Sequence, residues 1–97
     1  MIHLESWQFF LSLNPKSFSE LSRELYLKWA KDDEEEIKAL HSENASWQRI
    51  RERLRAEKDY DRMFAVEEVI WVNQKEIERL MRRVADEREN ANRFGKL

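Results

Sequence analysis

Two histidines, His3 and His41, are the side chains best suited to acid–base or metal chemistry in this chain. Neither has a recognisable spacing, because Lys38 stands three residues before His41, where a helical di-iron site needs an acid. The sequence holds no cysteine and one glycine, so it offers no thiol nucleophile and no glycine-rich phosphate loop. We therefore expect no catalytic residues, no metal and no cofactor, with both histidines at the surface.

The densest group of carboxylates is the run of five acids from Asp32 to Glu36. Such a run attracts divalent cations, but the central glycine of a calcium-binding loop is missing. Acids also favour the positive N-terminal end of a helix, and Asp33 with Glu36 has the spacing of a capping box. The run therefore predicts a solvated helix start after a corner near residues 31–33. The alternative is an uninterrupted helix with an acidic belt.

Large aromatic side chains are the candidates for binding another protein. The sequence has four Trp, five Phe and two Tyr in 97 residues, and a chain of this length has little interior in which to bury them. Aromatic side chains also dominate the energetics of protein interfaces. This excess indicates a non-catalytic protein–protein interaction module, such as an adaptor, assembly factor or inhibitor. The expected contact residues are Trp7, Phe9, Phe10 and Trp29.

Arginines supply the alternative interpretation, a small nucleic-acid-associated regulator. A nucleic-acid-binding domain of this size usually has a clear basic excess, whereas this chain has a net charge of −2. Nucleic acid is therefore the less favoured partner. The residues that would form the phosphate-binding surfaces are Arg49, Arg51, Arg53, Arg55, Arg79, Arg82 and Arg83.

Helices must position these residues, because Pro15 and Gly95 are the only proline and glycine and sheets normally need many turn residues. Apolar residues recur in steps of three and four from residue 61 to residue 94. This pattern predicts one long helix with a continuous seam for a partner. The seam continues past Met81, and with the thin core it predicts a homo-oligomer, most simply a dimer. The seam residues are Met63, Val66, Ile70, Asn73, Ile77, Leu80 and Val84.

Two features of the long helix concern its neighbours. A buried Asn in a seam can fix register and oligomer number at some cost in stability, so Asn73 either has this role or faces solvent at an irregularity. Tyr60, Phe64 and Trp71 form a second stripe beside the seam. The long helix is therefore expected to contact two neighbours.

The expected fold is all-α: a small helical bundle built on a long, coiled-coil-like antiparallel hairpin, with one or two shorter N-terminal helices. Pro15 ends the first element, and the next helix starts there or one turn later, with Ser17 as its cap. The apolar stripe changes phase between Arg55 and Asp61, where we place the hairpin turn; a continuous bent helix is the alternative. A single domain over 1–97 is predicted, with helices over 1–13, 15–31, 33–57 and 60–93.

The first of these helices, 1–13, has one charged residue and must be covered, either by the long helices or by docking onto another chain or a membrane surface. The segment carries no Lys or Arg, which does not favour the membrane surface. No apolar run is long enough to span a membrane. No secretory signal is recognisable. We therefore expect a cytoplasmic protein without a membrane span.

Overall fold

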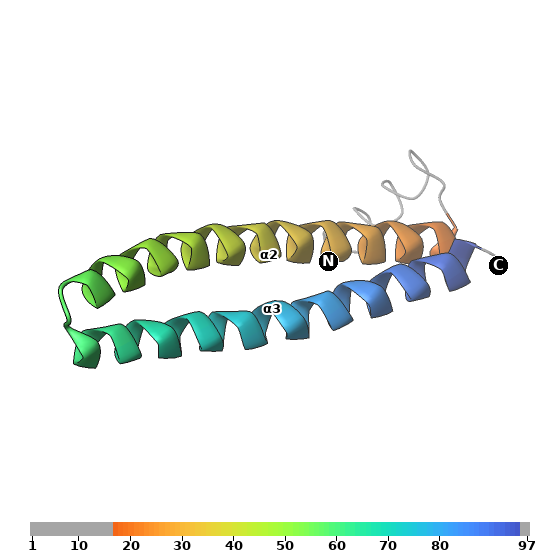
Figure 1. The fold of residues 1–97 in the computed structure, drawn as a ribbon. Helices are drawn as coiled ribbons and strands as arrows, with labels where there is room; N and C mark the ends of the chain where they lie inside the picture. Colours follow the sequence, from red (N-terminus) through yellow and green to blue (C-terminus); the bar gives the residue numbers. More distant parts are fainter. Residues whose placement is uncertain (1–16, 96–97) are drawn as a thin grey trace, which may run out of the picture.

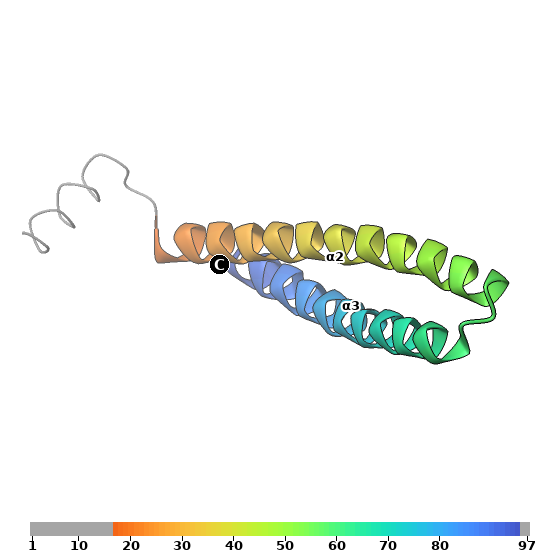
Figure 2. The same ribbon diagram turned by 90° about the vertical axis from the view of Figure 1, so that its left-hand side faces the viewer.

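The computed structural model describes residues 17–95, and over that range it consists of two long helices joined by a tight turn (Figure 1). The helices are α2, Phe18–Ala56, and α3, Tyr60–Gly95. They lie side by side and antiparallel in both views, so the start of α2 is close to the end of α3 (Figures 1 and 2). The prediction of an all-α fold built on a long helical hairpin is confirmed. The predicted helix 1–13 lies outside the described residues.

α2 begins where a side chain caps its first turn. Ser17 has an extended backbone, and its hydroxyl accepts a hydrogen bond from the backbone N–H of Glu20 at 3.2 Å. This bond satisfies one of the N–H groups that have no partner in the first turn of a helix. Of the two helix starts compatible with the sequence, the structure has the later one.

The predicted break near residues 31–33 is wrong, because α2 continues through it without interruption. Ala30 and Asp33 are both buried against α3, 1% and 6% exposed, and one helical turn places them on the same side. Lys31 and Asp32 stay exposed. With no proline or glycine to break the helix, the acidic residues extend it as an acidic belt. The interhelical packing on either side of them stabilises that conformation.

The turn after α2 lies where the phase shift of the sequence predicts it. Lys58 has a φ of 59°, in the left-handed region that usually favours glycine. The N–H of Asp59 donates to the carbonyl of Leu54 at 2.9 Å, which closes the end of α2. The Asp59 carboxylate then accepts from the N–H of Arg62 at 3.4 Å and caps α3. Lys58 thus takes the left-handed position where a glycine is usual, and these hydrogen bonds close a true hairpin.

The core is a single seam between the two helices. Near the turn, Leu54, Met63 and Val66 form a buried cluster against which Trp47, Ile50 and Ile70 pack. Further along, Ile77 and Leu80 are each 1% exposed and are the largest fully buried side chains among the described residues. At the far end, the rings of Tyr26 and Phe94 stack at 5.8 Å. The seam is thus one side chain thick and open to water along both edges.

Candidate protein-binding face

The candidate site lies on the side of α3 that α2 does not cover. Residues 69–72 are four consecutive apolar side chains, so this turn of α3 is apolar all round. Ile70 packs into the seam, and its carbonyl accepts a hydrogen bond from the Asn44 amide at 3.3 Å. Trp71 and Val72 point elsewhere and are 60% and 52% exposed. One helix can cover only one side of such a turn, so most of its apolar surface faces solvent.

This uncovered surface continues toward the hairpin turn. Phe64 is 59% and Tyr60 is 50% exposed, and Ala65 is exposed as well. They lie at helical intervals from the apolar turn, and we call this set the outer face of α3: Tyr60, Phe64, Ala65, Trp71 and Val72. Each member of the stripe that the sequence predicts for a second neighbour remains at least half exposed.

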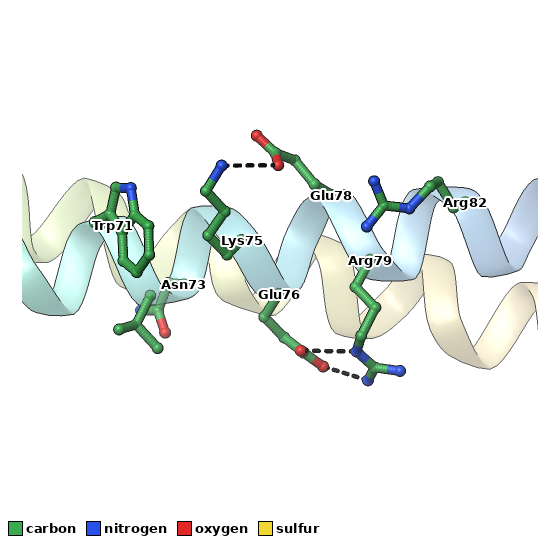
Figure 3. Close-up of a pocket in the computed structure, with 8 residues that line it drawn as sticks. Trp71, Asn73, Lys75, Glu76, Glu78, Arg79 and Arg82 are labelled. Carbon is green, nitrogen blue, oxygen red and sulfur yellow. Dashed lines mark hydrogen bonds and ion pairs between the residues drawn. The ribbon is translucent and has the colours of Figure 1, made fainter.

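Two shallow grooves border the outer face. One is lined by Ala65, Glu68, Val69, Val72 and Asn73. The other runs from the Trp71 ring to Arg82 and is shown in Figure 3. In it, the Lys75 ammonium lies 5.6 Å from the centre of the Trp71 ring and 3.5 Å from the Glu78 carboxylate. Both grooves are open, so they fit the side chains of a docking helix and not an enclosed small molecule.

Polar residues interrupt the seam opposite this face. The Asn73 amide donates to the side-chain oxygen of Asn44 at 2.9 Å and to the Glu43 carboxylate at 3.1 Å. Asn44 is 5% exposed, and Asn73 is partly buried. Asn73 therefore lies in the seam of its own hairpin, where its amide bonds fix how α2 and α3 are aligned.

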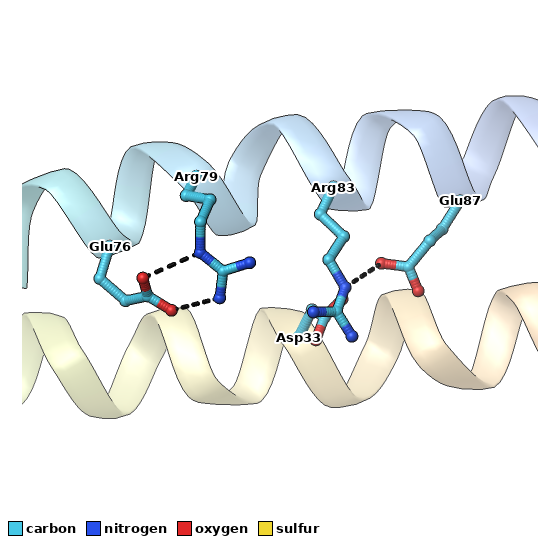
Figure 4. A network of polar contacts seen from close by, with 5 residues as sticks. All are labelled: Asp33, Glu76, Arg79, Arg83 and Glu87. Atoms are coloured by element: carbon cyan, nitrogen blue, oxygen red, sulfur yellow. Dashed lines mark hydrogen bonds and ion pairs between the residues drawn. The ribbon is translucent and has the colours of Figure 1, made fainter.

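A second polar layer lies nearer the end of α3 (Figure 4). Asp33 and Glu87 are buried, and the Arg83 Nε lies 3.1 Å from Asp33 Oδ2 and 3.7 Å from Glu87 Oε1. Burial raises the pKa of the Glu87 carboxyl to about 7, helped by the neighbouring Asp33 carboxylate, while Arg83 opposes the shift. Neither groove is lined by either carboxylate. The layer therefore lies within the packed seam, apart from both grooves.

Partial signals for this layer are present in the sequence. Glu87 interrupts the apolar pattern between Val84 and Ala91, and Asp33 follows Ala30 by one turn. Both positions are compatible with burial. Their proximity depends on the alignment of two distant helices, which a periodic pattern on each helix does not specify.

The predicted aromatic contact residues are only partly described. Trp29 is 45% exposed and makes an edge-on contact with Tyr26, with ring centres 5.4 Å apart. It is adjacent to Ala30 on α2, far along the hairpin from the outer face. The structure therefore does not bring Trp29 to the outer face. The other three predicted residues, Trp7, Phe9 and Phe10, lie outside the described residues.

The predicted oligomer seam faces α2 of the same chain. Ile70 and Asn73 are partly buried there, and the other members are buried. A role of these side chains in self-association stays a prediction. The buried members are Met63, Val66, Ile77, Leu80 and Val84.

The candidate phosphate-binding arginines do not form one surface. Arg49 to Arg55 lie on α2 near the turn, whereas Arg79 to Arg83 lie halfway along α3 (Figure 1). Most of them have acidic partners: the Arg79 guanidinium makes two bonds to Glu76 and lowers the pKa of that carboxyl (Figure 4). The other paired members are Arg51, Arg53, Arg55 and Arg83. Arg49 bonds to the Ser46 hydroxyl. Arg82 borders the Trp71 groove. This mixed charge does not favour a polyanion.

Residues 17–95 contain no group of three or more His, Asp or Glu side chains placed to hold a metal ion. Over the same range, neither helix includes a segment that could serve as a membrane span. No protein family matches the chain, and neither a curated protein nor a solved structure is significantly similar to it.

Proposed function

We propose that this chain is a non-catalytic protein–protein interaction module that binds through the outer face of α3. The observation that supports this is the position of Phe64 and Trp71, each more than half exposed on a rigid helix. Large apolar side chains exposed together on one side of a helix typically mark a binding site. The module acts as an adaptor, assembly factor or inhibitor. We further propose that it works as a homo-oligomer in the cytoplasm.

The energetics are compatible with this role. Full burial of Phe64, Trp71 and Val72 would contribute about 1.5–3 kcal/mol each in gross terms. Association costs several kcal/mol of lost motional freedom. The surplus is small and corresponds to a weak, reversible complex, which suits an adaptor.

Site-specific photo-crosslinking tests the proposal. A photoreactive amino acid at Phe64 is expected to give covalent adducts with protein in living cells, because this side chain is an exposed member of the outer face. The matched control is the same amino acid at Lys38, an exposed position on α2. Adducts no more abundant at Phe64 than at Lys38 would contradict the proposed function.

A further inference from the structure

We propose that the partner of the outer face is a second copy of this chain, with α3 docked antiparallel on α3 and the twofold axis between Trp71 and Val72. This inference rests on the proposed function and names its partner. Most homo-oligomers close as twofold dimers in which both copies use the same surface. A surface suits that arrangement when rotation about a central apolar point places its acidic residues opposite its basic residues. The outer side of α3 has this property.

The charges follow the outer side of α3 at intervals of seven residues, which places them on one stripe. Two acids come first and two bases follow. In an antiparallel pair about the proposed axis, Glu68 of one copy faces Lys75 of the other. The same alignment places Asp61 opposite Arg82. Twofold symmetry makes each contact twice, so unlike charges flank the apolar centre on both sides. The four residues are Asp61, Glu68, Lys75 and Arg82.

Most of these charges are unused within the hairpin. The side chains of Asp61, Glu68 and Arg82 have no ion-pair partner among the described residues. Lys75 pairs only with Glu78, one turn away on the same helix. Asp61, Glu68 and Arg82 are therefore available for contacts with a second copy at this surface.

Apolar contacts supply the centre of the proposed interface. Trp71 and Val72 of each copy lie on the axis, where 60% and 52% of their surfaces are available for burial. The same alignment places Phe64 over the side chain of Arg79 in the other copy. An arginine covers apolar surface with its aliphatic stem and attracts an aromatic ring through its guanidinium. The interface thus alternates apolar and charged layers.

Charge-swap variants of the full chain test both the partner and the alignment. Sedimentation equilibrium is measured for the wild type, Glu68→Lys, Lys75→Glu and the double variant. We expect each single swap to weaken the dimer about tenfold, because like charges then meet at both symmetric contacts. The double variant is expected to restore the wild-type Kd. Rescue within one chain is excluded, since Glu68 and Lys75 are two turns, about 10 Å, apart along the same helix.

Two controls complete the experiment. Glu35→Lys makes the same charge change at an exposed site on α2 and is expected to leave the Kd unchanged. Trp71→Ala is expected to give a monomer with the wild-type helical circular dichroism signal. A dimer unaffected by Trp71→Ala, or single swaps without rescue, would overturn the proposed docking. A wild-type monomer at all concentrations would also overturn it, whereas photo-crosslinking at Phe64 to a different protein would leave the interaction function standing.

Discussion

The two sides of α3 differ in a way that reverses the usual order of burial. The inner side, against α2, holds medium-sized aliphatic residues such as Ile77 and Leu80, each 1% exposed. The outer side holds larger aromatic residues, Phe64 and Trp71, which are about 60% exposed. A folded chain normally buries its largest apolar side chains first. The comparison teaches that the inner side holds the hairpin together, while the outer side is available for association.

The largest effect is expected from truncation on the inner side. Leu80→Ala removes a fully buried side chain and leaves a cavity, so we expect the free energy of unfolding to fall by about 2–4 kcal/mol. Met81→Ala is the matched control, because Met81 is the next residue and is 57% exposed. It is expected to change stability by less than about 0.5 kcal/mol. Urea unfolding followed by circular dichroism measures both, and equal losses would contradict the division into two sides.

The polar layer of the inner side is the next test. Asn73→Ala removes the partner of the buried Asn44 amide oxygen, which is then left without its hydrogen bond. We expect a loss of about 1–2 kcal/mol in the free energy of unfolding. Replacing both residues, Asn44→Leu with Asn73→Leu, is expected to cost less than the single change, since no buried group is left unpaired. A double variant less stable than Asn73→Ala would show that the two amides stabilise the hairpin by more than satisfying each other's hydrogen bonds.

The carboxylate layer makes stability depend on pH. The pKa of Glu87 is raised to about 7 in the folded hairpin, whereas an unfolded glutamate has a pKa near 4.5. Between these values the folded state keeps a proton that the unfolded state releases. Stability from this group is therefore present below about pH 4.5, falls as the pH rises toward 7 and is absent above it.

Glu87→Gln is expected to remove this pH dependence. At pH 8 the wild type holds a charged Glu87 carboxylate beside Asp33 and Asp32, whereas the variant is neutral there, so the variant should be more stable. We expect a difference of about 1 kcal/mol, because Arg83 and water at the open edge of the seam offset part of the cost of the charge. Thermal unfolding from pH 4 to pH 8 measures the effect. Glu89→Gln, on the exposed side of the same helix, is the control. A Glu87→Gln variant that is less stable than the wild type at pH 8 would refute the assignment.

The smallest effect is expected from the outer side. Phe64→Ala removes a side chain that touches solvent over 59% of its surface. At concentrations well below the dimer Kd, we expect the free energy of unfolding to change by less than about 0.5 kcal/mol. Dilute thermal unfolding, followed by circular dichroism, measures this change. A loss comparable to that of Leu80→Ala would mean that Phe64 belongs to the core and not to a binding face.

Part of the candidate site was predictable from local pattern. The stripe of Tyr60, Phe64 and Trp71 follows from helical spacing, because residues three and four apart share a side of a helix. The importance of Val72 was not predictable in the same way. Residues 69–72 place apolar side chains on every side of the helix, so the apolar pattern does not show which side α2 covers. Only the position of α2 shows which of these four side chains remain exposed.

By itself, the sequence determined that the chain is helical, where it turns and which residues form the seam, because these depend on steps of three and four and on local capping. Only the tertiary structure decided three further points: that α2 continues through residues 31–33, that Asp33 meets Glu87, and that Asn73 bonds to Asn44. Each depends on contacts between residues far apart in the chain. Helical periodicity fixes which residues share a side of one helix, but the alignment between two helices is set by the packing of both together.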